Sequence, residues 1–286
     1  MRLSIIAPDT TDSCYIYRAW PFEKLGIQTE GFSGRAGFQL HRAIINSDIC
    51  LLQRPWSQQH ISIAHTIKGC GKKFLIDWDD SYANIPIYNV NSQHFKDCQP
   101  FVAELARLAD AVTVTSDALK LEIESYGAKT VVKIPNAIDD SLKGIYRAPA
   151  RYKAIVWRGA VGGHHADMEH GKQTFLDFAA NGYELIFMGD IPAWGYQIEK
   201  KRHFAVTDYS NYLSTLARIA PEYMYVPLVD NLFNQGKSDI AAQEAWLCGC
   251  KLIHSNIGEF KGLPEVGTPR WISEVNHLRR ELLENL

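Results

Sequence analysis

The stretch LVDNLFNQGKSDIAAQEAWLCGC, residues 228–250, changes from loop to helix half-way along. Asn, Asp and Gly mark its first half, and apolar residues at helical spacing fill its second half. Lys237 stands at the junction, where the free amides and dipole of a helix N-terminus attract an anion. Glu244 lies on the same face, about 10 Å further along the axis. This spacing suits a diphosphate at Lys237 and a ribose at Glu244, and it equally suits a solvated lysine and a structural glutamate.

Outward from this stretch, short apolar runs alternate with amphipathic stretches along the whole chain. This alternation predicts βαβ units and parallel sheets. Strands are expected at residues 3–8, 48–55, 72–80, 111–116, 130–135, 154–159, 184–190, 223–228 and 251–255. Helices are expected at residues 57–71, 95–110, 117–127, 172–182, 208–221, 237–249 and 271–286, with Ser116 as the N-cap of the third.

The pattern breaks at residues 141–153, where a glycine, a proline and scattered basic residues predict a linker. We therefore expect an N-terminal domain over residues 1–145 and a C-terminal domain over residues 150–270. The last helix, residues 271–286, is expected to pack back on the first domain. Both domains are expected to be Rossmann-like, with doubly wound parallel sheets facing across a cleft. Ligands of such sheets bind at the carboxyl ends of the strands, so the cleft is the expected site.

Composition narrows the class of protein. The chain has 286 residues, with 30 Lys and Arg against 32 Asp and Glu, for a net charge of -2. This balance argues against a dedicated, strongly basic nucleic-acid binder. Six cysteines without a Cys-x-x-Cys pair are typical of a reducing, cytoplasmic compartment. The opening MRLSIIAPDT is interpreted as a first strand rather than a signal peptide, and no apolar run is long enough to span a membrane.

The opening stretch, extended to VPLVDNLFNQGKSDIAAQEAWLCGCKLIHSNIGEF, resembles the donor-binding segment of retaining GT-B glycosyltransferases of the "glycosyl transferases group 1" superfamily. It looks closest to a short branch of bacterial and phage enzymes. The matching positions are Pro227, Leu228, Asp230, Phe233, Asn234, Lys237, Ser238, Glu244 and Gly249. Further matches are IVWRGAVGGHHADM, FLIDWDDSYANIP, YRAWPFEKLG, LLQRP and KIPNAID, so the resemblance covers most of the chain.

The resemblance implies a role for several residues. Arg158 and Lys237 would hold the diphosphate and stabilise its charge as it leaves. Glu244 would bind the ribose, and Gly189 would border the nucleotide base. Gly236 stands where the family has another glutamate near the sugar, so a neighbouring aspartate or a main-chain amide is expected to replace it. The other positions implied in donor binding are Gly159, Asp230, Asn234 and Ser238.

Three carboxylates, Asp77, Asp79 and Asp80, follow an apolar strand and are expected beside the cleft. They could ligate a metal, contact sugar or acceptor hydroxyls, serve as a base, or cap the next turn. The resemblance favours sugar or acceptor contact for Asp79 and Asp80, with no Mg²⁺ requirement and no cofactor besides the nucleotide sugar. His164 is expected in a glycine-containing loop beside Arg158, which makes it a candidate catalytic residue. No Cys/His cluster has the spacing of a zinc site.

These observations imply a retaining glycosyltransferase that moves a sugar from a UDP- or GDP-sugar to an acceptor hydroxyl. The acceptor stays open between a glycan, a lipid-linked sugar and a hydroxymethylated DNA base flipped into the cleft. The missing glutamate keeps a second class open, a nucleotide-binding or regulatory module that lacks catalysis. An epimerase or phosphorylase on the same fold is a third possibility. The donor's sugar and base and the oligomeric state do not follow from the sequence.

Overall fold

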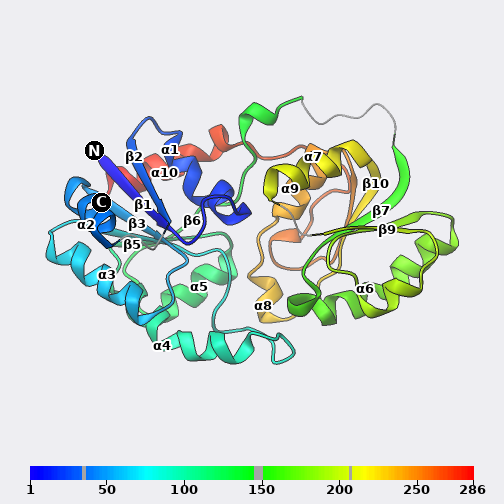
Figure 1. Ribbon diagram of the computed structural model, residues 1–286, viewed down its shortest axis with the longest axis horizontal. Helices are drawn as coiled ribbons and strands as arrows, with labels where there is room; N and C mark the ends of the chain where they lie inside the picture. The colour runs from blue at the N-terminus through cyan, green and yellow to red at the C-terminus, as the bar shows by residue number, and fades with distance from the viewer. Residues whose placement is uncertain (34–36, 145–150, 206–207) are drawn as a thin grey trace.

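A computed structural model describes residues 1–33, 37–144, 151–205 and 208–286 of the chain. Two α/β units lie side by side, each built on one parallel sheet (Figure 1). Of the predicted linker at 141–153, residues 145–150 lie outside the described part. The domain boundary placed there therefore stays a prediction.

The first sheet has six parallel strands in the order β2-β1-β3-β4-β5-β6. They are β1 (Arg2–Ala7), β2 (Gln28–Ser33), β3 (Ile49–Gln53), β4 (Lys73–Asp77), β5 (Ala111–Val114) and β6 (Val131–Lys133). The second sheet has five parallel strands in the order β11-β10-β7-β8-β9. They are β7 (Tyr152–Gly159), β8 (Glu184–Gly189), β9 (Lys201–Phe204), β10 (Pro221–Val226) and β11 (Lys251–His254).

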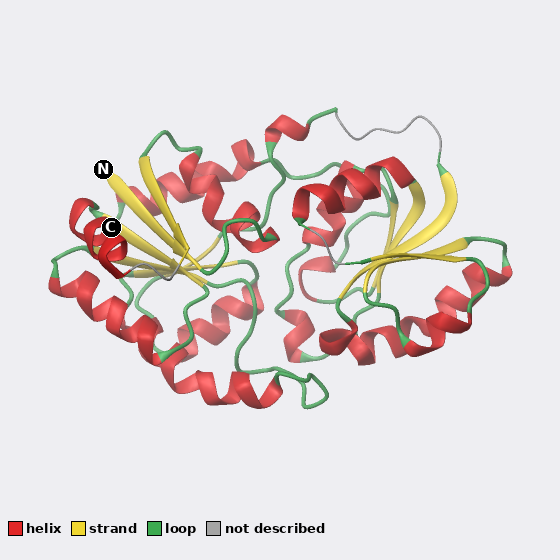
Figure 2. Cartoon of the chain, viewed as in Figure 1, coloured by secondary structure: helices red, strands yellow, loops and turns green. Residues whose placement is uncertain are grey.

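Helices cover both faces of each sheet (Figure 2). The first sheet carries η1 (Tyr15–Ala19, a π-helix), α1 (Trp20–Glu23), α2 (Gly37–Asn46), α3 (Gln58–Gly69), α4 (Ser92–Leu108), α5 (Asp117–Ser125) and α10 (Ile272–Glu284), with η2 (Asp140–Leu142) following it. The second carries α6 (Val161–Ala180), η3 (Ala193–Gln197), α7 (Tyr209–Ile219), α8 (Leu232–Gln235), α9 (Ile240–Leu247) and η4 (Gly258–Phe260). The predicted class, two doubly wound parallel sheets, is confirmed.

Strand periodicity explains why both faces of the first sheet are buried. Successive side chains point to opposite faces, so Ile6 joins one core cluster while Leu3 and Ile5 join the other. Helices α3, α4 and α5 pack on the first of these faces. Elements η1, α1 and α10 cover the second face. Val275 and Leu283 of α10 belong to the core cluster there. The C-terminal helix thus completes the core of the first sheet.

The sequence analysis did not predict several of the observed elements. The missed strands are β2 and β9, and the missed helices are η1, α1, α2 and α8. Helix α6 begins at Val161, eleven residues before the predicted start, so His164 lies in a helix and not in a loop. His164 still departs from helical geometry, with φ -124° and ψ 24°, because two helical segments join there at a kink. Ser116 does cap α5, accepting a hydrogen bond from the Leu119 amide at 3.2 Å.

Candidate functional site

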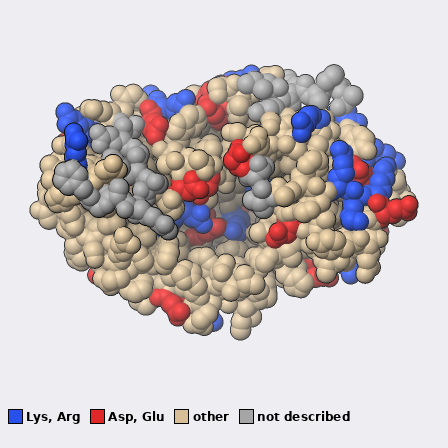
Figure 3. Space-filling view, viewed as in Figure 1, with Lys and Arg blue, Asp and Glu red and all other residues tan. Residues whose placement is uncertain are grey.

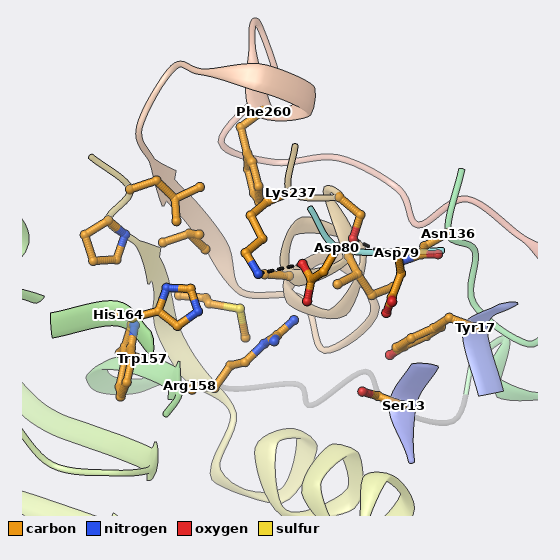
Figure 4. A pocket seen from close by; sticks show the side chains of 18 of the residues that line it. Ser13, Tyr17, Asp79, Asp80, Asn136, Trp157, Arg158, His164, Lys237 and Phe260 are labelled. Atoms are coloured by element: carbon orange, nitrogen blue, oxygen red, sulfur yellow. Dashed lines mark hydrogen bonds and ion pairs between the residues drawn. The ribbon is translucent and has the colours of Figure 1, made fainter. Parts of the chain in front are cut away.

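The carboxyl ends of the two sheets face one cavity of roughly 250 Å³. Ser13 and Tyr17 reach it from beyond β1, and Asp80 from beyond β4. Arg158 reaches it from the end of β7, and Lys237 from the connection after β10. Figure 3 shows a hollow between the two units with both signs of charge inside it, and Figure 4 shows these side chains converging. The cavity lies at the edge where parallel sheets bind ligands.

Lys237 lies in this cavity, but it does not begin a long helix. Asn231 caps the one-turn helix α8, and Lys237 follows that turn, with its amide bonded to the Asn234 carbonyl at 3.1 Å. Helix α9 begins only at Ile240, and the residue before it, Asp239, pairs with Arg270 at 2.9 Å. The helix thus begins two to three residues later than predicted, but Ile240 and Ala241 at its start line the same cavity, so anion binding at this helix N-terminus stays a prediction. Lys237 can attract an anion only through its own ammonium group.

The Lys237 ammonium lies 2.7 Å from the Asp80 carboxylate across the cleft (Figure 4). A second cation, Arg54 at the end of β3, lies 3.1 Å from Asp79 and 3.9 Å from Asp80. Burial alone would raise the pKa of Asp80, but Lys237 and Arg54 outweigh it and the net pKa is lowered. Asp80 is therefore held as an anion beside two cations.

Arg54 was missed by the sequence analysis. Its backbone is left-handed, with φ 52°, which is uncommon for a residue with a side chain. Its amide bonds to the Asp77 carbonyl at 2.8 Å, so the turn aims the guanidinium at the aspartates after β4. The aspartate charge raises the pKa of Arg54, Asp79 being the largest cause. The only sequence feature that could have indicated Arg54 is its position directly after an apolar strand, and many arginines with a purely structural role share that position.

Asp77 does not face the cavity. It is fully buried and forms an ion pair with the equally buried Arg18 at 2.5 Å. Thr113 also donates to it at 2.5 Å. This carboxylate therefore fixes the segment after β1 onto the end of β4. Among the described residues, no group of three or more His, Cys, Asp or Glu side chains is arranged to hold a metal ion.

Glu244 is 2% exposed and its carboxylate is surrounded by donors. Arg158 donates to Oε2 at 3.0 Å, and the Tyr212 hydroxyl donates to the same oxygen at 2.9 Å. The Tyr17 hydroxyl donates to Oε1 at 2.8 Å from the other sheet. Burial alone would lower the pKa of Arg158, but Glu244 outweighs burial and raises it. Helix α9 is buried on most sides, so Glu244 belongs to an internal network rather than to one face of an amphipathic helix.

His164 and Asp167 form a pair at the kink of α6. His164 Nδ1 lies 2.7 Å from Asp167 Oδ2, and His164 lines the cavity. Asp167 is 1% exposed, and its other oxygen accepts from the Val229 amide and from Asn234 Nδ2. A histidine held through Nδ1 by a buried carboxylate presents Nε2 for proton transfer or hydrogen bonding.

The residues predicted for donor binding divide into two groups. Gly159 and Ser238 line the first cavity. Asn234 is 1% exposed and bonds to Asp167 and the Val229 carbonyl, while Asp230 accepts from the Gln235 side chain. Neither Asp230 nor Asn234 lines this cavity or the neighbouring one. In this arrangement Asn234 shapes the loop before Lys237.

A second cavity of roughly 820 Å³ adjoins the first and shares Ser13, Arg158 and Gly159 with it. Gly189, Tyr209 and Glu244 also line it. Gly189 has φ 115°, and a Cβ there would collide with the Gly159 carbonyl, so only glycine fits. The two cavities therefore meet at Arg158, and Lys237 lines the first of them.

Comparisons with known proteins bear on the fold. No family model and no curated protein matches the chain. A glycosyltransferase from Rickettsia africae ESF-5 aligns over 90% of this chain and 79% of its own, at 13% identity and a TM-score of 0.51. An alpha,alpha-trehalose 6-phosphate synthase from Burkholderia multivorans covers 93% and 71%, at 12% identity and a TM-score of 0.47. A variant of Os79 from O. sativa in complex with UDP covers 99% and 91%, at 10% identity and a TM-score of 0.44.

The chain thus has a GT-B-like fold of two Rossmann-like domains. Within the described residues, no helix combines the length and apolarity that crossing a membrane requires.

Proposed function

We propose that the chain is a retaining glycosyltransferase that moves a sugar from a UDP- or GDP-sugar to an acceptor hydroxyl. The observation that carries this proposal is the placing of Arg158 and Lys237 around one cavity, opposite Asp79 and Asp80 of the other sheet. Two cations facing one cavity suit a diphosphate, and carboxylates opposite them suit hydroxyl groups. The GT-B-like fold supports the same function by analogy.

In this proposal, Arg158 and Lys237 hold the diphosphate and stabilise its negative charge as the bond to the sugar breaks. His164, oriented by Asp167, adds a hydrogen bond to the diphosphate or a proton to the leaving oxygen. The base lies in the larger cavity against Gly189, with the ribose towards Glu244. Two fixed cations neutralise much of the diphosphate charge, so we expect activity without Mg²⁺.

The second sheet therefore provides the donor side and the first sheet the acceptor side. Domain limits of 1–145 and 150–270 are part of this proposal, with residues 271–286 returning to the first domain. Asp79 and Asp80 contact the transferred sugar or the acceptor. A glycan, a lipid-linked sugar and a hydroxymethylated DNA base are the acceptor classes to test. Acceptor affinity that falls steeply with salt would select DNA, and salt-independent affinity would select a neutral glycan.

The first test is thermal unfolding with UDP, GDP, ADP, TDP and CDP, followed by the matching sugar donors. Ligand at about 100 times its Kd stabilises the folded state by roughly 2.7 kcal/mol, which raises Tm visibly. We expect one diphosphate to raise Tm, and Lys237→Ala to weaken its binding about tenfold or more, because a charged hydrogen bond is lost.

The matched control is Lys172→Ala, which removes a half-buried lysine on α6 whose only described partner is Glu169. It should bind the diphosphate as the wild type does. If none of the diphosphates raises Tm, or if Lys237→Ala binds as tightly as Lys172→Ala, the proposed donor site is wrong.

A second candidate function is a nucleotide-binding module without catalysis. Gly236, where the resembled family has a glutamate, favours it. Its signature would be a clear Tm shift with a diphosphate and no turnover of any sugar donor with any of the three acceptor classes.

A further inference from the structure

The Glu244 carboxylate has limited room for another donor. A carboxylate offers about four acceptor positions, two on each oxygen. Oε2 is filled by Arg158, whose Nε and Nη2 both lie 3.0 Å from it, and by Tyr212, while Tyr17 takes one position of Oε1. A ribose that donated both of its hydroxyls to Glu244 would need both positions of Oε1. The Tyr17 hydroxyl and the second ribose hydroxyl therefore compete for one acceptor position.

Tyr17 differs from the other two donors in where it comes from. Arg158 and Tyr212 belong to the second sheet and its helix α7, whereas Tyr17 lies on η1 after β1 of the first sheet. Its hydroxyl also contacts the Tyr209 hydroxyl at the start of α7, and its ring is 3% exposed. Tyr17 therefore ties the two domains together through the residue proposed to bind the ribose.

The backbone of Tyr17 is firmly held. Its neighbour Arg18 forms the buried ion pair with Asp77, and Arg279 of α10 donates to the Tyr17 carbonyl at 3.4 Å. Because η1 is fixed to the first sheet in this way, Tyr17 can leave Glu244 in two ways only. Its side chain rotates, or the two domains move apart.

We propose that Tyr17 is a latch residue, whose hydroxyl holds the position on Glu244 that a ribose hydroxyl takes when the donor binds. Donor binding then exchanges one bond between the domains for a bond to the ribose, while other bonds between them, such as Asn136 to Ser238 and Ser116 to the Gly236 carbonyl, remain. The Tyr209 hydroxyl, released from Tyr17, lines the same cavity and can contact the ribose. This inference rests on the proposed function, because it takes Glu244 as the ribose site.

The same pattern recurs at another cross-domain pair of the cleft. Lys237, proposed to hold the diphosphate, is paired with Asp80 of the first sheet at 2.7 Å. Lys237 and Glu244 are thus each partnered by a side chain of the first domain, whereas Arg158 pairs with Glu244 inside the second. A donor must replace both partners to bind fully.

The test is calorimetric titration of wild type and Tyr17→Phe with the diphosphate that gives the largest Tm shift, and with its 2′-deoxy analogue. Removing the competing hydroxyl should tighten diphosphate binding roughly three- to tenfold, the value of one hydrogen bond to a charged group. The gain should shrink for the 2′-deoxy analogue, which needs only one position on Oε1. A merely structural tyrosine would not distinguish the two ligands.

Tyr212→Phe is the matched control, because it removes a tyrosine hydroxyl from the same carboxylate within one domain, and Nε and Nη2 of Arg158 still fill Oε2. It should leave the Kd unchanged or raise it. The latch is overturned if Tyr17→Phe leaves the Kd unchanged or raises it, or if Tyr212→Phe tightens binding equally. If neither wild type nor Tyr17→Phe binds any diphosphate, the proposed function fails and the latch fails with it. A Tm of Tyr17→Phe near that of wild type shows that the variant is folded.

Discussion

Asp80 forms ion pairs with two cations of the cleft, Lys237 and Arg54. It lies 2.7 Å from Lys237 and 3.9 Å from Arg54, and these cations bring its pKa below its usual value despite burial. A carboxylate whose folded-state pKa is depressed stabilises the folded state above its unfolded pKa. That contribution disappears as the pH falls through the lower folded pKa.

We therefore expect Asp80→Asn to flatten the acid limb of the stability curve. Wild type should lose stability as the pH falls below about 4, where an unfolded aspartate begins to bind a proton, and Asp80→Asn should lose less over that range. Urea unfolding at a series of pH values measures this. In a Lys237→Ala background the effect of Asp80→Asn should shrink, since Lys237 is the first-ranked cation. An equal slope in wild type and Asp80→Asn would show that the pair does not shift this carboxylate.

At the scale of elements, the close packing of α6 on β10 shapes the donor side. Gly171 lies in α6 where an added Cβ would come 2.6 Å from Pro227 and 3.1 Å from Tyr225. This contact sets how near α6, with His164 at its start, lies to the connection that carries Lys237. Helix propensity would favour alanine at this position, but tertiary packing excludes it.

Gly171→Ala should therefore lower the free energy of unfolding by about 1–3 kcal/mol, the usual cost of overpacking. Gly69→Ala is the matched control. Gly69 is also a helical glycine, the last residue of α3, and a Cβ added to it would have no atom within 4 Å. It should be neutral or stabilise by up to about 1 kcal/mol, through helix propensity. Chemical denaturation of both variants decides the point. Similar values for the two would mean that α6 can shift away from β10 without loss.

The elements that the sequence missed share a physical feature. Strands β2 and β9 are two of the four outer strands, and their sequences QTEGFS and KRHF are largely polar, unlike those of the predicted outer strands β6 and β11. An outer strand has one neighbour and needs fewer apolar residues, so its pattern is weak. The strands predicted correctly are apolar for most of their length, because helices bury both of their faces.

At the scale of the whole molecule, the chain crosses between domains more than once. Helix α10 follows the second sheet in sequence, yet Val275 and Leu283 pack in the core of the first (Figure 1). Arg279 on the same helix is fully buried, and burial together with Arg18 lowers its pKa to about 9. The last helix thus stabilises the first domain and supports the segment that carries Tyr17.

Leu283→Ala should cost about 2–5 kcal/mol of stability, as for other buried leucines. The loss should appear in the first domain, as faster amide exchange in β1 and β3, with β7 and β8 little changed. Glu284→Ala, an exposed neighbour, should stay within about 0.5 kcal/mol. Faster exchange confined to β7 and β8 would contradict the assignment of α10 to the first core.

The sequence by itself determined the strands of the sheet interiors, the doubly wound class and the strand ends that carry Arg158, Lys237 and Asp80. Apolar periodicity is a local property. It can be recognised in the sequence because a buried strand carries its apolar residues within a few consecutive positions. Only the tertiary structure decided which charges meet. Tyr17 and Glu244 are 227 residues apart, and Asp80 and Lys237 are 157 apart. The partner of each carboxylate is the group that lies next to it after folding, and the separation of the two residues in the sequence does not predict that contact.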